Sequence, residues 1–232
     1  MSMLPFVVGG ALLMIVGGCQ LDVPPGENPV LYLVNQTLSP NPAISWEELS
    51  EQLASEDADL RREAVLLLGK PGRSKALAAP EILSVLALDD PDELVRATAI
   101  EVLARISDSE TVISIMAQAS RSDGRQVRLA SVKALKGHRS DKSMEILLDR
   151  LANDEVAPVK AQAAQLLSGY RHQRVLERLL AALTDDDFQV SYQVRESLKK
   201  LTGRDFEYDL FAWKKWIKGQ QDPFSALAGD YE

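Results

Sequence analysis

Residues Val127 to Leu135, Val-Arg-Leu-Ala-Ser-Val-Lys-Ala-Leu, carry the pattern that decides the fold. Val127, Ser131 and Leu135 stand four residues apart, so they fall on one stripe of an α-helix. The small residue in the middle of the stripe lets a neighbouring helix approach closely. Gly137 follows the stretch, as is typical just past the end of a helix. We therefore predict a short helix that packs along this stripe.

The same pattern occurs five times at spacings of 31 to 35 residues. The first position of the stripe is apolar, the second is mostly small and the third is always leucine. These three rows are Leu60, Val95, Val127, Val159 and Val190; Ala64, Ala99, Ser131, Ala163 and Val194; and Leu68, Leu103, Leu135, Leu167 and Leu198. Left-handed C-caps are predicted at the glycines that follow, which are Gly69, Gly137, Gly169 and Gly203. A second apolar helix is expected after each break, over 80–88, 111–119, 142–151, 174–183 and 209–218.

This arrangement resembles HEAT repeats, in particular the short bacterial repeats of phycobilisome-lyase-like proteins. The matching signature is an acidic turn, an apolar-basic pair, alanine and leucine, as in Asp92-Glu93-Leu94-Val95-Arg96 with Ala99 and Leu103. The resemblance covers 45–218 and implies an all-α fold, a right-handed α-α superhelix of about five stacked helix pairs. The repeats are expected near 57–88, 89–121, 122–152, 153–184 and 185–218.

The composition agrees with this expectation. Of 232 residues, 46% are hydrophobic and only 6% aromatic, so the core is expected to consist of Leu, Ala, Val and Ile. Such a core suits closely packed helices better than a β-sandwich. The net charge of −8 argues against a protein that coats nucleic acid with its whole surface. The single cysteine excludes an intramolecular disulfide.

The N-terminus contains an apolar run from Leu4 to Gly18 without any charged side chain. At about 1.5 Å per residue, this run is too short to cross a bilayer as a helix, and its length suits the apolar part of a secretory signal. It ends in Val16-Gly17-Gly18-Cys19, which resembles the lipobox of bacterial lipoproteins. The resemblance implies a signal peptide over 1–18, cleavage after Gly18 and lipid attachment at Cys19.

Three features qualify or extend this N-terminal reading. Met1-Ser2-Met3 contains no Lys or Arg, which leaves a misassigned start codon or an uncleaved N-terminal anchor as alternatives. Gln20 in place of aspartate after the cysteine implies the outer membrane, by resemblance to the sorting rule of diderm bacteria. Residues 19–44 are rich in proline, which blocks helices, so a tether is expected before the repeat domain at 45–218 and a C-terminal tail at 219–232.

The predicted turns contain aspartate, and four of the five first helices carry a basic residue directly after the first row. The aspartates either cap helices, ligate Ca²⁺ or act as paired catalytic carboxylates, and we favour capping. The basic residues either pair with turn aspartates as a ladder or form a stripe that binds phosphates, and we favour the ladder. These basic residues are Arg61, Arg96, Arg128 and Lys160, with Ser191 at the fifth position.

Charge is distributed unevenly along the repeats. Residues 121–142 contain seven Lys or Arg and two Asp, whereas residues 45–63 contain seven acids and two Arg. The basic zone is either a solvated face or a surface for a protein partner, an anionic lipid headgroup or an anionic envelope polymer. Its candidate interaction residues are Arg121, Arg125, Lys133, Lys136, Arg139 and Lys142.

Aromatic residues gather at the C-terminal end, where seven of the thirteen follow residue 203. Trp213 and Trp216 lie three residues apart and therefore share a helix face. Both are candidate interaction residues, since tryptophan dominates binding hot spots. The favoured alternative is a cap that shields the open end of the last repeat.

Catalytic and metal-binding motifs are absent from the sequence. His138 and His172 do not form the His-Glu pairs of HEAT-repeat hydroxylases related to deoxyhypusine hydroxylase. We expect no cofactor, no metal, no nucleic-acid partner and no enzymatic activity. The expected function is a membrane-anchored scaffold that binds protein in the cell envelope, with the second helices lining the concave face. The alternatives are an enzyme or enzyme subunit of bilin-lyase-like type, and a cytoplasmic scaffold if the signal is not processed.

Overall fold

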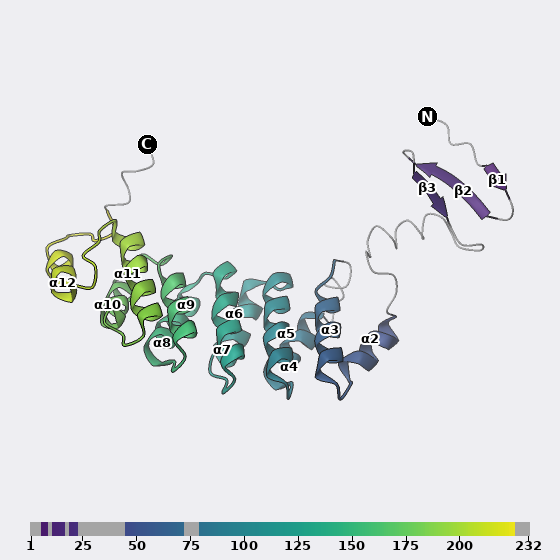
Figure 1. Ribbon diagram of the computed structural model, residues 1–232, viewed down its shortest axis with the longest axis horizontal. Helices are drawn as coiled ribbons and strands as arrows, with labels where there is room; N and C mark the ends of the chain where they lie inside the picture. Colours follow the sequence, from purple (N-terminus) through teal and green to yellow (C-terminus); the bar gives the residue numbers. More distant parts are fainter. Residues whose placement is uncertain (1–5, 9–10, 17–18, 23–44, 72–78, 226–232) are drawn as a thin grey trace.

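The computed structural model describes residues 6–8, 11–16, 19–22, 45–71 and 79–225, and over 45–225 it is a row of stacked helix pairs (Figure 1). The first helices of the pairs, helices A, are α3 (Ala58–Leu68), α5 (Glu93–Ile106), α7 (Arg125–Ala134), α9 (Ala157–Leu167) and α11 (Phe188–Thr202). The second helices, helices B, are α4 (Ala79–Asp89), α6 (Ser109–Ala119), α8 (Asp141–Asn153), α10 (Gln173–Ala182) and α12 (Leu210–Lys218). Helix α2 (Trp46–Leu53) precedes the first pair, and the short 3₁₀ helix η1 (Leu135–Gly137) follows α7.

The helices form two layers. Each helix A packs against the next helix A, from α3 to α11, and each helix B packs against the next helix B, from α4 to α12. This arrangement confirms the predicted all-α solenoid. Each of the five predicted repeat ranges contains one helix A and one helix B.

The core follows the rows predicted from the sequence. All members of the second and third rows are at most 1% exposed, including Ser131, whose hydroxyl donates to the Val127 carbonyl at 2.7 Å. In the first row the four valines are fully buried, but Leu60 is 40% exposed, so its predicted core position is wrong. The reason is its place at the end of the layer, because α3 has a helix A neighbour, α5, on one side only.

A small antiparallel sheet lies near the N-terminus, in the order β1 (Phe6–Val8), β2 (Ala11–Val16) and β3 (Cys19–Asp22). Its register pairs Phe6 with Leu13 and Val16 with Cys19. Sequence analysis did not predict these strands. Residues 23–44, which include most of the expected tether, and residues 226–232 of the expected tail lie outside the described residues. Within the described part of the chain, no helix combines the length and the apolar character needed to cross a membrane.

The glycine prediction is correct at only one of its four positions. Gly203 ends α11 with φ of 67° and is the one described glycine in the left-handed region. Gly69 has a φ of −77°, and its value lies in space, because a Cβ there would stand 2.7 Å from Cγ1 of Val102 on α5. Glycine at this helix end therefore permits close packing between repeats.

Ion pairs between successive repeats confirm the predicted ladder. Arg61 Nε donates to Asp90 Oδ2 at 2.8 Å, Arg128 Nε donates to Asp154 Oδ2 at 2.9 Å, and Lys160 pairs with Asp185. The Asp90 and Asp154 carboxylates raise the pKa values of Arg61 and Arg128 through these hydrogen bonds. Since Arg61 and Arg128 are buried, the alternative of a phosphate-binding stripe is wrong for them.

One rung of the ladder is missing between the second and third repeats. Ser122 stands where the other repeats have Asp90, Asp154 or Asp185, and its hydroxyl accepts from the Gly124 amide at 3.2 Å. Arg96 instead donates to backbone, at 2.6 Å to the Asp90 carbonyl.

The same junction contains a helix cap supplied by the preceding repeat. Asp57, Asp92 and Asp187 cap their own helices A, which confirms the capping role predicted for them. Gly124 has no side chain to do this, and the Glu93 carboxylate accepts from the Gln126 amide in α7. Gly124 also makes room for the carboxylate, because a Cβ there would stand 2.9 Å from Glu93 Oε1.

We expect Glu93→Ala to lower the free energy of unfolding by about 1 kcal/mol, the usual loss when a helix cap is removed. Glu101→Ala is the matched control, since Glu101 is exposed on the same helix, and its expected loss is below about 0.5 kcal/mol. Urea unfolding followed by circular dichroism measures both. Equal losses would show that the carboxylate does not cap α7.

Candidate interaction surface

The largest described cavity lies on the helix A layer, over the third, fourth and fifth repeats. It has a volume of about 570 Å³. We call it the basic groove and define it by its polar lining residues Lys133, Lys136, Arg139, Gln162, Gln165 and Lys200. Leu135, Leu166 and Tyr170 complete the lining as apolar surface.

Three helices A and the turn after η1 position the cations of the groove. Lys133 lies in the last turn of α7, Lys136 lies in η1, and Lys200 lies near the end of α11. Lysine at the C-terminal end of a helix is favoured by the helix dipole. Because successive repeats place these helix ends beside one another, residues far apart in sequence come together at one edge of the layer.

Arg139 is held in the groove by a glycine and a tyrosine. Its guanidinium stands 4.9 Å from the centre of the Tyr170 ring, a cation–π distance. A Cβ at Gly169 would stand 2.7 Å from Arg139 Nη2, so glycine at this position leaves space for the guanidinium. Burial raises the pKa of the Tyr170 phenol, which therefore remains neutral under the arginine at physiological pH.

The four cations of the groove differ from those of the ladder in having no carboxylate partner. All four are exposed, and no ion pair within the described residues includes Lys133, Lys136, Arg139 or Lys200. Histidine and carboxylate side chains are missing from the groove lining. The groove therefore presents an uncompensated positive charge, which attracts anions.

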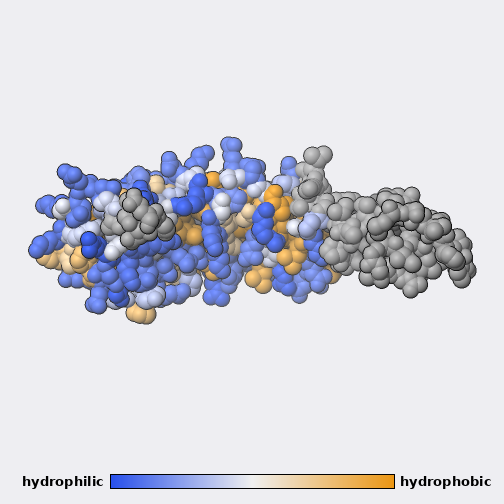
Figure 2. All heavy atoms as spheres, turned by 90° about the horizontal axis from the view of Figure 1, so that it is seen from above, coloured by the Kyte–Doolittle hydropathy of each residue, from blue (hydrophilic) through white to orange (hydrophobic). Residues whose placement is uncertain are grey.

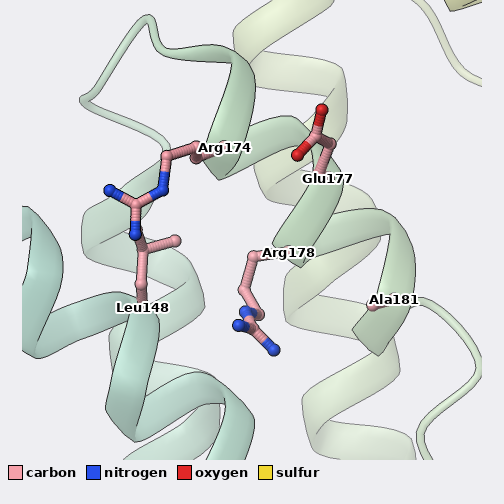
Figure 3. Close-up of a pocket in the computed structure, with 5 residues that line it drawn as sticks. All are labelled: Leu148, Arg174, Glu177, Arg178 and Ala181. Carbon is pink, nitrogen blue, oxygen red and sulfur yellow. The ribbon is translucent and has the colours of Figure 1, made fainter.

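Two smaller cavities lie elsewhere on the repeats. One of about 190 Å³ lies along α3, α5 and α7 and shares Lys133 with the basic groove. The other, of about 200 Å³, lies between α8 and α10 on the helix B layer, where Arg174 and Arg178 flank Leu148 (Figure 3). Arg174 is already paired with Glu145. Figure 2 shows that the described surface seen from above is mostly hydrophilic, with apolar side chains between the polar ones.

The two histidines have structural partners. His138 is buried, with Nε2 at 2.8 Å from the Ala104 carbonyl and Nδ1 at 3.1 Å from the Ser109 hydroxyl, so it joins the third repeat to the second. His172 caps α10 by accepting from the Arg174 amide at 3.1 Å. Over the residues that the structure describes, no three His, Cys, Asp or Glu side chains gather as a metal site.

Comparison with known families fits the layered repeats. The family model for HEAT repeats matches this chain over residues 46–136 and 79–168, which together cover more than half of it. The chain belongs to the HEAT-repeat family. No curated protein matches this HEAT-repeat chain by sequence.

Solved structures share the fold at low sequence identity. An engineered protein matches with a TM-score of 0.50 and 18% identity, over 80% of this chain and 90% of its own. A second engineered protein has a TM-score of 0.49 and 19% identity, over 80% of this chain and 95% of its own. Human deoxyhypusine hydroxylase has a TM-score of 0.33 and 16% identity, over 87% of this chain and 88% of its own, and carries no argument about function. These similarities describe the solenoid and not an activity.

The HEAT-repeat surface brings together three of the six basic residues singled out from the sequence. Lys133, Lys136 and Arg139 line the groove. Arg121, Arg125 and Lys142 are exposed but do not line it. Lys200 does line it, and sequence analysis missed this residue. The available signal was its position at the end of the fifth helix A, which corresponds to the end of the third, where Lys136 lies.

The two candidate tryptophans serve the C-terminal cap to different extents. Trp213 is fully buried, packs edge to face on Phe206 at 5.0 Å between ring centres, and donates from Nε1 to the Glu207 carbonyl at 3.1 Å. Its assignment to an interaction surface is therefore wrong, because it has no exposed area. Trp216 is half-buried and lies 6.0 Å from the Phe206 ring.

Arg195 ties the same cap to the last helix A. It donates two hydrogen bonds to Asp205, at 2.9 and 2.7 Å, from the fifth repeat, where Ser191 replaces the basic residue of the ladder. The bond from Arg195 holds the pKa of Asp205 well below its usual range. The loop before α12 is thereby joined to α11.

Proposed function

We propose that this chain is a non-catalytic scaffold that binds a protein partner in its basic groove and is held in the cell envelope by lipid on Cys19. The observation that carries the binding role is the groove itself, with four exposed cations that lack carboxylate partners. Its lining residues offer amides, cations and apolar surface, but no histidine or carboxylate to act as a general base. Such a lining supports binding better than acid–base catalysis.

The binding role is tested by site-specific photo-crosslinking in intact cells. A photoreactive amino acid at Gln165 samples the groove, and one at Arg178, exposed on the helix B layer, is the matched control. We expect a discrete protein adduct from position 165 and a weaker one or none from position 178. Adducts of equal yield, or none at either position, would contradict a protein-binding groove.

The proposed anchor rests on the N-terminal sequence. Cys19 is the sole cysteine and follows Val16-Gly17-Gly18 directly after the apolar run. Cleavage after Gly18 would remove β1 and β2, so the three-stranded sheet would belong to the unprocessed chain only. Lipoproteins of this type carry more than one acyl chain, which is enough for stable membrane attachment. We assign the anchored protein to the periplasmic side of the outer membrane on the basis of Gln20.

We expect Cys19→Ser to move the protein from the membrane fraction to the soluble or unprocessed pool and to abolish labelling with a fatty-acid analogue. Loss of the only thiol removes the site of thioether formation, while the repeat domain is unaffected. Ser2→Ala, which alters the same segment without touching the thiol, is the control and should leave both readouts unchanged. Equal membrane retention of Cys19→Ser and wild type would defeat the lipid anchor without affecting the proposal for the groove.

A further inference from the structure

The span of the basic groove limits what its ligand can be. Lys133 lies on α7 and Lys200 lies on α11, with α9 packed between the two helices. Helices in contact are about 8–10 Å apart, so these helix axes are separated by roughly 16–20 Å. One compact anion does not reach both ends. An extended chain advances about 3.3 Å per residue and spans this length in about six residues.

Two glutamines on α9 supply the groups that a peptide backbone requires. Gln162 Nε2 donates to Gln165 Oε1 at 2.9 Å. Among the described residues this is the one hydrogen bond of either amide, which leaves one carbonyl and one amino group beside the groove. A peptide bond offers a matching N–H donor and C=O acceptor. A phosphodiester offers acceptors alone, so the amide pair favours a peptide over a phosphate polymer or a lipid headgroup.

The floor of the groove is apolar. Leu135 and Leu166 line it, and Tyr170 lies beneath the Arg139 guanidinium. Successive side chains of an extended strand point to opposite sides. A strand in the groove can therefore direct every second side chain to the leucines and the intervening ones to the lysines at the rim.

We propose that the basic groove binds an extended acidic segment of a partner protein, in which acidic and apolar side chains alternate over about six residues. This inference rests on the proposed protein-binding function and names the chemistry of the partner. The four unpaired cations recognise the acidic side chains, the glutamines recognise the backbone, and the leucines recognise the apolar side chains.

The test measures binding of a fluorescent peptide of alternating Glu and Leu, about ten residues long, to the full chain by anisotropy. We expect Lys136→Glu/Lys200→Glu to weaken binding by about tenfold or more, because both charges become repulsive at the rim. Lys142→Glu/Lys218→Glu makes the same change in net charge at exposed positions outside the groove and should alter affinity less than about twofold. Equal losses in the two double variants would reduce the effect to net charge and overturn the proposal.

Two further probes separate the peptide from other anions. A peptide of alternating Glu and Gly should bind more weakly, because it leaves the leucines uncovered. Inorganic polyphosphate and phosphatidylglycerol vesicles should compete poorly at the same charge concentration. Undetectable peptide binding, or tighter binding of polyphosphate or vesicles, would overturn the acidic-segment proposal. A crosslinked protein at Gln165 would still support the scaffold function in that case, so the two failures are distinguishable.

Discussion

Replacing Asp154 with asparagine is expected to lower the free energy of unfolding by about 3–5 kcal/mol, the usual loss when one partner of a buried ion pair is removed. The Asp154 side chain is fully buried and accepts from Arg128 Nε at 2.9 Å, Arg128 Nη2 at 3.2 Å and the Val156 amide at 3.0 Å. Asparagine keeps the shape but loses the charge, and its amino group would face a donor. Arg128 would remain buried with an uncompensated charge.

Urea unfolding followed by far-UV circular dichroism checks this expectation. Asp186→Asn is the matched control, because Asp186 is exposed and the substitution is the same, and its expected loss is below about 0.5 kcal/mol. Similar stability of the two variants would show that the ladder does not hold the repeats together.

Trp213→Ala is the second substitution with a large expected effect, a loss of about 3–5 kcal/mol as for other buried aromatic residues replaced by alanine. The substitution removes the edge-to-face contact with Phe206 and the hydrogen bond to the Glu207 carbonyl, and it opens a cavity at the end of the solenoid. Because repeats are coupled to their neighbours, the loss should appear first at the C-terminal end.

Amide hydrogen exchange shows where the structure opens. We expect protection to fall in α10, α11 and α12 while α5 and α7 keep most of theirs. Phe211→Ala on the same helix is the control, since Phe211 is 76% exposed, and it should leave protection unchanged. A uniform loss of protection along all helices would argue against a local cap, and unchanged stability would argue against any structural role of Trp213.

The fold was predictable because each repeat states its own pattern. Rows at four-residue spacing identified the buried faces of all five helices A, and the aspartates before them identified the caps. Leu60 escaped this reasoning because burial depends on a neighbouring helix and not on the residue. The missing rung at Ser122 is visible in sequence only once the ladder is known, since serine and aspartate both close the turn.

The candidate surface was less predictable because it is built across repeats. A run of charges along the sequence identified Lys133, Lys136 and Arg139, which are close in the chain. Lys200 joins them only through stacking of α9 and α11 onto α7. Trp213 shows the opposite error: the spacing that places two tryptophans on one face does not reveal whether that face meets solvent or the last repeat.

The basic groove also has a mechanical consequence. Its two ends belong to α7 and α11, which are joined through α9 and not by a rigid continuous element. A solenoid bends by small rotations at each junction between neighbouring repeats. Such rotations change the separation of Lys133 and Lys200, so curvature of the whole rod sets the width of the groove. A segment seated across all three helices would in turn act as a brace, stiffening the C-terminal half of the rod against bending.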